Sequence, residues 1–322
     1  MLSLIVPIFR NQENLARLLP ELEALAGRLP CELEVVFVVD GSPDASFRIL
    51  QETLPSWPVR AQLIELSRNF GSFPAITAGL QKASGEYFAI LAADLQEPPE
   101  LIVEFHRLMQ NGEADIVFGA RAGRSDPWLS RFLSRSFWAL YRRLIASGMP
   151  PGGVDVFGCT RQVRDELVDL KEANTNLVAL LFWIGFRQRF VPYERRARVE
   201  GRSAWSYGRK LRYAVDSIFG FTDLPIRVLL ALGCAGVGAA VLAAAGVSIA
   251  RMAGAIRVLG YTPLLLAIVF FGGLTAMGLG IIGQYLWLSL QNSRRRPNFI
   301  VKSTDRFVQD RAPGNPGKDP AP

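Results

Sequence analysis

Nine residues in the first third of the chain read Ala92-Ala93-Asp94-Leu95-Gln96-Glu97-Pro98-Pro99-Glu100. They follow the apolar run Tyr87–Leu91, which predicts a buried strand, and the Pro pair predicts the start of a helix, because Pro is tolerated in the first helical turn. Asp94 and Gln96 are therefore expected on a turn at the carboxyl end of a strand, where open α/β sheets bind ligands. A carboxylate and an amide oxygen there can hold Mg²⁺ or Mn²⁺ against a diphosphate.

Apolar runs alternate with helical periodicities through the first part of the chain. The predicted strands are Leu2–Ile8, Leu33–Val39, Ala61–Leu66, Tyr87–Leu91 and Ile116–Phe118, and the first predicted helix is Gln12–Leu29. Continuous Val, Ile and Leu strands that alternate with helices predict an α/β fold with a mostly parallel sheet covered on both faces. In the helix after the third strand, Ala75 and Gly79 permit close packing on that sheet.

Polar side chains follow four of the predicted strands where each strand ends. They are Arg10 and Glu13, Asp40, Arg68 and Asn69, and Asp94 and Gln96. Because the carboxyl ends of parallel strands share one edge of a sheet, we expect these side chains to gather there. For any single position, the alternative is an ordinary polar residue at the start of a loop. That alternative explains all four strand ends together less well.

Composition narrows the class of protein. The net charge of +7 suits an anionic lipid or a phosphorylated substrate, and without a nucleic-acid motif no nucleic-acid partner is expected. The three scattered cysteines predict neither a disulfide framework nor a zinc site. His106 is the only histidine, which argues against histidine-based triads, and its place on the helix after Pro99 predicts a surface residue.

Residues 128–147 have the pattern of an amphipathic helix. Arg131 and Arg135 fall on the face opposite to Leu133 and Phe137 in a helical projection. A basic face opposite an apolar and aromatic one is typical of a helix at a membrane interface, although a surface helix packed on the core has a similar pattern. A juxtamembrane helix is predicted over residues 207–226.

The segments Arg227–Ala250 and Thr262–Leu290 are the membrane candidates. Each contains roughly twenty apolar residues, enough to cross a hydrocarbon core of about 30 Å, whereas two buried helices of a soluble protein are the alternative. Basic residues gather on both outer flanks, which predicts a multi-pass protein of the cell (inner) membrane with its catalytic domain and both termini in the cytoplasm. Residues 291–322 are predicted to be a cytoplasmic tail, with its end disordered after Phe307.

Small residues recur every four positions in the second membrane candidate, at Gly272, Ala276 and Gly280. Such a seam permits close approach of helices. It can join the two spans to each other or join subunits of a homo-oligomer, and the sequence leaves both readings open.

The motifs, taken in order, resemble those of family-2 glycosyltransferases with the GT-A fold. The segments that carry the resemblance are Leu4-Ile5-Val6-Pro7, Asp40-Gly41-Ser42-Pro43-Asp44, Ser67-Arg68-Asn69-Phe70-Gly71, Asp94–Glu100, Gly119-Ala120-Arg121 and Arg198 with Gly201-Arg202-Ser203-Ala204-Trp205. Together with the membrane hairpin they are similar to the polyprenyl-phosphate glycosyltransferases, a group that includes bactoprenol glucosyltransferases and dolichol-phosphate mannose synthase.

The resemblance implies a GT-A domain over residues 1–206 and a reaction at the cytoplasmic face of the bilayer. A hexosyl group moves, with inversion, from a nucleotide-diphosphate sugar, first of all UDP-glucose, to polyprenyl (undecaprenyl) phosphate. Other donors (a UDP-linked N-acetylhexosamine, modified arabinose or GDP-mannose), a glycerolipid acceptor and an inactive membrane scaffold remain alternatives.

The resemblance also assigns roles to individual residues. It implies catalytic roles for Asp94, Asp155 and Arg121, donor contacts by Pro7, Glu13, Asp40, Arg68 and Asp94, acceptor or phosphate contacts by Arg131, Arg135, Arg198 and Ser203, and metal ligation of Mg²⁺ or Mn²⁺ by Asp94 and Gln96. Two positions depart from the family pattern, because Val39 and Ala92 stand where acidic residues are usual. The second change leaves Asp94 and Gln96 as the metal ligands and predicts weaker binding of the cation without the donor.

Overall fold

The computed structural model describes residues 1–121, 148–150, 154–170, 177–196, 224–252, 261–294 and 296–307. The predicted interfacial helix at 128–147, most of the predicted juxtamembrane helix and the tail after Phe307 lie outside these residues. Contacts divide the chain into two compact units. The first comprises Met1–Lys171, Thr175–Ala204 and Pro297–Pro322, and the second comprises Glu172–Asn174 and Trp205–Arg296.

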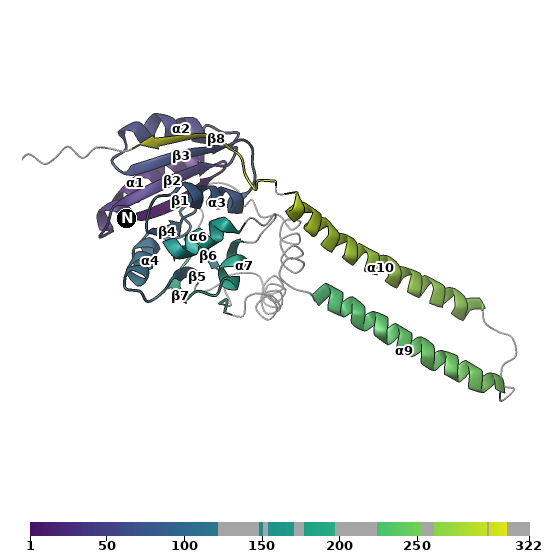
Figure 1. Cartoon of the computed structure of the whole chain (residues 1–322). Helices are drawn as coiled ribbons and strands as arrows, with labels where there is room; N and C mark the ends of the chain where they lie inside the picture. The colour runs from purple at the N-terminus through teal and green to yellow at the C-terminus, as the bar shows by residue number, and fades with distance from the viewer. Residues whose placement is uncertain are drawn as a thin grey trace, which may run out of the picture. The chain divides into compact units, whose positions relative to one another are not determined.

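An eight-stranded sheet in the order β7-β5-β6-β4-β1-β2-β3-β8 forms the centre of the first unit (Figure 1). The strands are β1 Leu2–Ile8, β2 Leu33–Val39, β3 Arg60–Leu66, β4 Tyr87–Ile90, β5 Ile116–Arg121, β6 Val154–Thr160, β7 Gln188–Tyr193 and β8 Val301–Phe307. All neighbours within β4-β1-β2-β3 run parallel, as do β5 and β7, whereas β6 and β8 run antiparallel to their neighbours. The predicted α/β fold with a mostly parallel sheet is confirmed.

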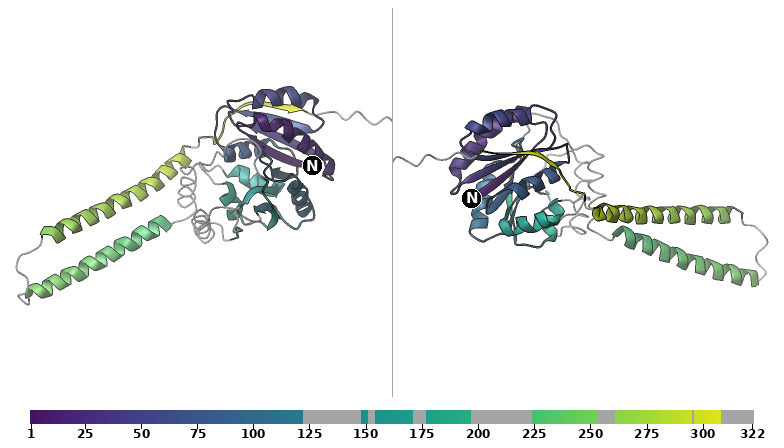
Figure 2. Two further views of the ribbon diagram at one scale, coloured as in Figure 1. Left: turned by 180° about the vertical axis from the view of Figure 1, so that it is seen from behind. Right: turned by 45° about the horizontal axis from the view of Figure 1, so that its top comes forward.

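Helices cover the sheet on both faces (Figure 2). They are α1 Gln12–Arg28, α2 Ser46–Thr53, the 3-10 turn η1 Leu54–Ser56, α3 Ser72–Lys82, α4 Glu100–Gln110, α6 Arg161–Asp169 and α7 Leu177–Trp183. Helix α1 contacts α2 and α4, and α3 contacts α6. Strand β2 is buried along its whole length because helices lie against both of its faces.

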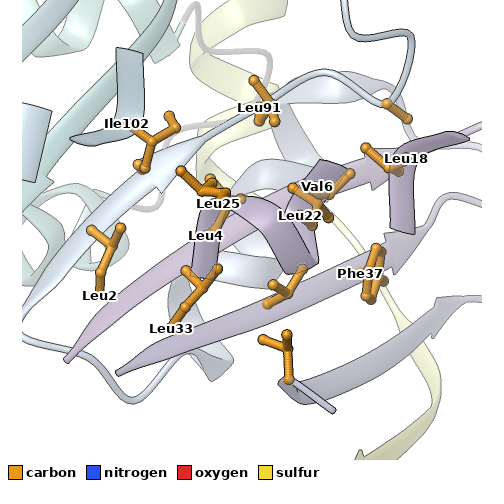
Figure 3. Close-up of a cluster of buried hydrophobic side chains, with 14 of the residues drawn as sticks. Leu2, Leu4, Val6, Leu18, Leu22, Leu25, Leu33, Phe37, Leu91 and Ile102 are labelled. Atoms are coloured by element: carbon orange, nitrogen blue, oxygen red, sulfur yellow. The ribbon is translucent and has the colours of Figure 1, made fainter. Parts of the chain in front are cut away.

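The hydrophobic core between α1 and the sheet holds β1 in place. Leu18, Leu22 and Leu25 of α1 belong to the same buried cluster as Leu4 and Val6 of β1 (Figure 3). Burying one leucine contributes about 1.5–3 kcal/mol relative to leaving it exposed. This packing holds the carboxyl end of β1, where predicted donor residues begin, in a defined place.

Helix α3 packs unusually close to the opposite face of the sheet. A Cβ atom on Gly79 would lie 2.5 Å from Cγ2 of Ile5 and 3.1 Å from Cγ2 of Val38. A side chain at this position would have to displace Ile5, so the predicted close approach of this helix is confirmed.

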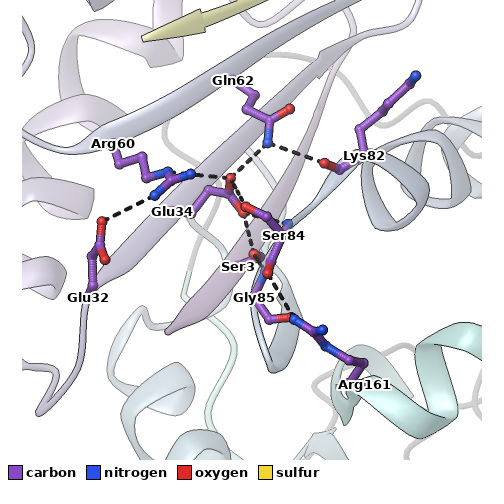
Figure 4. A network of polar contacts seen from close by, with 9 residues as sticks. All are labelled: Ser3, Glu32, Glu34, Arg60, Gln62, Lys82, Ser84, Gly85 and Arg161. Carbon is purple, nitrogen blue, oxygen red and sulfur yellow. Dashed lines mark hydrogen bonds and ion pairs between the residues drawn. The ribbon is translucent and has the colours of Figure 1, made fainter. Parts of the chain in front are cut away.

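A buried carboxylate ties the amino ends of the parallel strands together (Figure 4). Glu34, which is 0% exposed, accepts hydrogen bonds from Gln62 Nε2 at 2.7 Å and from the hydroxyl and backbone N–H of Ser84 at 2.6 and 2.9 Å. The hydroxyl of Ser3 also donates to it. Burial alone raises the pKa of Glu34, but these hydrogen bonds outweigh burial and hold the pKa below its usual value. The carboxylate therefore stabilises the sheet at the edge opposite to the predicted site.

We expect Glu34→Gln to destabilise the protein by about 1–3 kcal/mol at pH 7, since a buried network loses charge-assisted hydrogen bonds. Because the folded pKa lies below the unfolded one, the stabilisation is present above the unfolded value and is lost as pH falls through the folded pKa. Denaturant unfolding of the purified protein should thus show a smaller loss of stability between pH 6 and about 3 in Glu34→Gln than in the parent. Parallel pH profiles would contradict this assignment.

His106 is not a surface residue, and that prediction was wrong. Its side chain is 2% exposed, its Nε2 lies 3.3 Å from Sγ of Cys31, and its ring meets that of Tyr87 edge-on at 5.1 Å. Burial lowers the pKa of His106, which favours a neutral imidazole. The residue belongs to the buried face of α4, one helical turn from Ile102.

Two long helices make up the described part of the second unit, α9 Leu224–Met252 and α10 Tyr261–Ser293. Among the described residues one helical segment, Phe270–Gln291, is long and apolar enough to cross a membrane, with a mean hydropathy of 1.3 and 0% of that window buried. A shorter apolar segment, Pro225–Gly236, lies in α9. The two predicted membrane segments thus coincide with helices, and one of them meets the length and hydropathy of a span.

Contacts between α9 and α10 involve glycines outside the predicted seam. A Cβ on Gly278 would meet Leu229 at 3.4 Å, and one on Gly236 would meet Phe271 at the same distance. Among the described residues, nothing lies within 4 Å of the Cβ positions of Gly272 and Gly280.

The segment after α10 returns to the sheet of the first unit. The sequence predicts a tail over residues 291–322, but within it Val301–Phe307 forms β8, which pairs antiparallel with β3. Lys302 Nζ lies 2.8 Å from Glu65 Oε1 and reinforces this pairing. The sequence of β8 is largely polar because β8 is an edge strand, and an apolar run therefore did not mark it.

Candidate active site

The predicted site residues come together through the strand directions. The carboxyl ends of β1, β2, β3 and β4 share one edge because these strands are parallel, which brings Asp40, Arg68 and Asp94 to that edge. Strand β5 points the same way, since β6 is antiparallel to both β4 and β5, so Arg121 ends there as well. Asp155 is the second residue of β6 and enters the sheet at this edge, although the structure does not describe its side chain. The predicted common edge is confirmed.

The turn after β4 is tight and partly strained. Leu95 has φ of 51°, a left-handed conformation that costs about 1–2 kcal/mol for a residue with a side chain. Its buried side chain anchors the turn, and its N–H donates to the carbonyl of Ala92 at 3.3 Å. Asp94 is half-buried, Gln96 is 9% exposed, and the N–H of Gln96 lies 3.4 Å from Asp94 Oδ1. Strained backbone of this kind is concentrated at functional sites.

The residues of this turn fit a hard cation. Asp94 and Gln96 offer a carboxylate and an amide oxygen, while Ala92 offers no side-chain ligand. The described residues contain no group of three or more His, Cys, Asp or Glu that could enclose a metal ion. Mg²⁺ and Mn²⁺ commonly keep waters and take phosphate oxygens, so two protein ligands suit a cation that is shared with a bound diphosphate.

Asp40 organises the loop after β3. Its carboxylate, which is 3% exposed, accepts hydrogen bonds from the N–H groups of Phe70 at 2.7 Å and Gly71 at 2.8 Å. Burial raises the pKa of Asp40, and these bonds and the charge of Arg68 only partly oppose it. The carboxylate thus holds residues 70–71 at the edge of the site, in addition to the donor contact predicted for it.

Gly41 permits the loop after β3 to lie directly against the loop after β2. Its φ is +55°, and a Cβ on it would lie 2.2 Å from the carbonyl carbon of Arg68 and 2.5 Å from the backbone nitrogen of Asn69. Only glycine fits a position that is both left-handed and in contact with another backbone.

Asp44 links the loops after β1 and β2, a role that sequence reasoning missed. Its Oδ1 accepts a hydrogen bond from the Ser42 hydroxyl at 2.6 Å, and its Oδ2 accepts one from the N–H of Gln12 at 3.1 Å. The N–H of Arg10 donates to Ser42 Oγ at 2.8 Å, and the N–H of Ala45 donates to Gln12 Oε1 at 2.9 Å. An Asp just before a helix is a common turn-forming residue, and that was the available signal.

The other predicted donor residues lie at the same edge. Pro7 is half-buried in β1, and Glu13 is exposed in the first turn of α1. Arg68 is exposed, with its guanidinium carbon 4.0 Å from the centre of the Phe70 ring. Arg121, the last residue of β5, is half-buried opposite Tyr193.

The predicted acceptor residues lie outside the described part of the chain. They are Arg131, Arg135, Arg198 and Ser203. Their assignment stays a prediction.

A mostly parallel sheet with polar residues at the carboxyl ends of its strands is the architecture that the resemblance to GT-A glycosyltransferases predicts. The chain matches the family model described as glycosyl transferase family 2 over residues 3–170, and it belongs to that family. It is 32% identical over 301 residues to "Uncharacterized glycosyltransferase sll0501" of Synechocystis, covering 93% of this chain and 94% of the relative. It is 31% identical over 303 residues to the "Bactoprenol glucosyl transferase" of Shigella phage SfV, covering 94% and 98%.

Solved structures resemble the chain more distantly. Glucosyl-3-phosphoglycerate synthase from Mycobacterium tuberculosis, in complex with phosphoglyceric acid, superposes with a TM-score of 0.49 at 16% identity, over 69% of this chain and 80% of that one. The S. aureus protein TarS, residues 1-349 in complex with UDP-GlcNAc, gives 0.45 at 19% identity, over 69% and 67%.

Proposed function

We propose that the protein transfers a hexosyl group, with inversion, from a nucleotide-diphosphate sugar to polyprenyl phosphate at the cytoplasmic face of the membrane. UDP-glucose and undecaprenyl phosphate are the first substrates to test. Relatives that match nearly the whole chain are named bactoprenol glucosyl transferase, which supports this pair.

The observation that carries the proposal is the edge of the sheet at which the chain leaves it after β7 and returns to it at β8. Strand β7 ends with Tyr193 at the edge that holds Asp94, and α9 is the next described helix in the sequence. Strand β8 begins with Val301 at the same edge, and the N–H of Ser67 donates to the carbonyl of Ile300 at 3.0 Å. The edge proposed to bind the donor is also the edge at which the chain leaves the sheet after β7 and returns to it at β8.

The return of β8 supports a two-crossing topology. A sheet is one folded body and lies on one side of a membrane, so the chain between β7 and β8 must cross an even number of times. If Phe270–Gln291 of α10 crosses, a second crossing is needed, and α9 is the helix available for it in the described residues. Basic residues beyond both helices favour the cytoplasm for the sheet.

Cysteine labelling in intact spheroplasts tests this topology. We expect a membrane-impermeant maleimide to modify Arg257→Cys from outside, because residue 257 lies between the two helices. Lys302→Cys, on β8, should react only after lysis. Labelling of Lys302→Cys from outside would contradict the proposed topology.

The proposed reaction depends on the positioning of the two substrates more than on removal of a proton from the acceptor. A phosphate monoester has a second pKa near 6, so the acceptor is largely a dianion at pH 7 and is already nucleophilic. Asp94 and Gln96 would hold Mg²⁺ or Mn²⁺, which when bound supplies positive charge to the departing diphosphate. Arg121 would bind phosphate oxygens in its planar fork, and Asp155 would orient the acceptor or a sugar hydroxyl.

Recognition of the two substrates is divided between different elements. The proposed donor contacts come from Pro7, Glu13, Asp40 and Arg68, and the acceptor phosphate contacts from Arg131, Arg135, Arg198 and Ser203. Preorganised charges of this kind lower the barrier without reorganising during the reaction.

A donor panel tests the proposal. Purified protein is incubated with undecaprenyl phosphate and radiolabelled UDP-glucose, UDP-linked N-acetylhexosamine or GDP-mannose, with Mg²⁺ or Mn²⁺, and lipid-linked sugar is extracted. We expect one donor to label undecaprenyl phosphate, and we expect a glycerolipid acceptor to remain unlabelled. Labelling of the glycerolipid alone, or of neither lipid with any donor, would overturn the proposal.

A further inference from the structure

The loop that follows β1 contains a residue in an unfavourable backbone conformation. Arg10 has φ of 55°, and Leu95 in the turn after β4, with φ of 51°, is the one other non-glycine residue of the described chain whose φ is positive. A left-handed conformation is disfavoured for residues with a Cβ atom, and where it persists it is concentrated at functional sites. Because β1 and β4 are neighbours in the sheet, the two strained residues follow adjacent strands at its carboxyl edge.

Contacts with the loop after β2 hold Arg10 in this conformation. The N–H of Arg10 donates to Oγ of Ser42 at 2.8 Å, and the hydroxyl of Ser42 donates to Oδ1 of Asp44 at 2.6 Å. The other oxygen of Asp44 accepts a hydrogen bond from the N–H of Gln12 at 3.1 Å, so this carboxylate occupies the first N–H of α1. The group that the loop offers to a ligand is therefore the side chain of Arg10 rather than the start of the helix.

The side chain of Arg10 can bind an anion. It is exposed, and its guanidinium carbon lies 5.5 Å from the centre of the Phe9 ring, which is 37% exposed. The described residues place no carboxylate within ion-pair distance of this guanidinium. The planar fork of an arginine binds two phosphate oxygens at once, so Arg10 offers a phosphate group a positive charge on a backbone that is held in place.

The strand order places Arg10 beside the turn that carries Asp94. The chain passes from β1 to β2 and β3 on one side and then returns to β4 on the other side of β1, so the order of the strands reverses between β1 and β4. Open α/β sheets bind ligands in the crevice at such a reversal. The loop of Arg10 and the turn of Asp94 lie at the two strand ends that flank this position.

A nucleotide diphosphate bound at this edge has to pass the end of β1. The proposed cation ligands follow β4, whereas Asp40 and Arg68, which are proposed to contact the donor, follow β2 and β3. Neighbouring strands lie about 4.8 Å apart, so the ends of β4 and β2 are separated by about 10 Å, with the end of β1 between them. The diphosphate that links the nucleoside to the cation therefore lies over the strand end that carries Arg10.

We propose that Arg10 binds the diphosphate of the donor. This inference rests on the proposed function, because it takes the ligand at this edge to be a nucleotide diphosphate. Ala92 offers the cation no side-chain ligand, so the turn after β4 supplies fewer protein oxygens than a fully acidic motif would. A guanidinium from the neighbouring loop adds positive charge to the same diphosphate and stabilises its negative charge as the sugar leaves.

Equilibrium binding of uridine and of UDP to the purified full-length protein, with Mn²⁺ present, tests this contact. We expect Arg10→Gln to weaken the binding of UDP about tenfold, as loss of a hydrogen bond between two charged groups typically does. Uridine has no phosphate, so its affinity should stay within about twofold of that of the parent. A loss of affinity as large for uridine as for UDP would place Arg10 against the nucleoside and overturn the inference.

Thermal unfolding of Arg10→Asn separates binding from a structural role. Asparagine adopts the left-handed conformation more readily than arginine does, so the variant keeps the loop and loses the charge. We expect its midpoint of thermal unfolding to equal or exceed that of the parent, while UDP binds about tenfold more weakly. A variant that loses stability and affinity together would show that Arg10 serves to hold the loop, and this result would contradict the proposed contact.

Arg17→Gln is the matched control, because it removes the same charge from an exposed residue of α1 that lies more than one helical turn beyond the start of the helix. Its affinity for UDP should stay within about twofold of that of the parent, since exposed charges away from a ligand are screened by solvent. Equal weakening in Arg17→Gln and Arg10→Gln would show a general effect of net charge and overturn the inference.

The inference and the proposed function fail through different results. A parent protein that binds neither UDP nor GDP refutes the proposed function. If the parent binds GDP instead of UDP, guanosine and GDP replace uridine and UDP in the same comparison. A parent that binds its nucleotide diphosphate, together with an Arg10→Gln variant of unchanged affinity, refutes the role of Arg10 and leaves the proposed function standing.

Discussion

Asp94→Ala is expected to reduce sugar transfer by about a thousandfold or more. The substitution removes the carboxylate from a turn in which Ala92 supplies no replacement ligand. Loss of one group that stabilises developing charge typically reduces the rate 10²–10³-fold, and loss of a cation ligand adds to this effect. Initial rates with the donor found in the panel, over a range of Mn²⁺ concentrations, measure it.

Asp169→Asn is the matched control for Asp94→Ala. Asp169 is an exposed acid at the end of α6, outside the proposed site, so its loss should leave the rate nearly unchanged. Asp94 is only half-buried, so both variants should keep a midpoint of thermal unfolding close to that of the parent. Normal turnover of Asp94→Ala at low Mn²⁺ would contradict the assignment of this residue to the cation.

Gly41→Ala is expected to have the second largest effect, about a hundredfold loss of transfer. The new methyl group would overlap the backbone of Arg68 and Asn69, and φ of +55° is strained for alanine by about 1–2 kcal/mol. The protein can relieve the overlap by moving residues 68–71 away from Asp40, which takes Arg68 out of the donor site. The KM for the nucleotide sugar and the midpoint of thermal unfolding should both be measured.

Gly27→Ala separates this effect from a general intolerance of alanine. Nothing lies within 4 Å of a Cβ on Gly27 in the last turn of α1, so alanine should be neutral or stabilise by about 0.5–1 kcal/mol. A Gly41→Ala protein that unfolds like the parent and keeps its donor KM would contradict the packing described between Gly41 and Arg68.

The parallel strands could be predicted because a strand that is buried on both faces consists of an almost uninterrupted run of apolar residues. Leu2–Ile8 and Leu33–Val39 were predicted with their observed bounds, since helices cover both sides of these strands. The common edge followed from the same pattern. The carboxyl ends of parallel strands lie at one edge of the sheet, and this does not depend on the sequences of the loops. Asp40 and Asp94 were placed at that edge for this reason.

Features that depend on contacts between distant segments escaped prediction. Strand β8 is mostly polar and is recognisable only through its pairing with β3, and Glu97 and Arg195 meet through the fold rather than through a motif. His106 is a different case. It follows Ile102 by four residues and precedes Met109 by three, so the helical periodicity of α4 could have placed it on the buried face.

Equilibrium binding of UDP to the purified protein, with and without Mn²⁺, tests the central claim most directly. The claim is that the carboxyl edge of the sheet binds a nucleotide diphosphate together with a cation held by Asp94 and Gln96. We expect saturable binding that Mn²⁺ strengthens about tenfold or more in the parent but not in Asp94→Ala. Absence of saturable binding of UDP and of GDP, with Mg²⁺ or Mn²⁺ present, would contradict the claim.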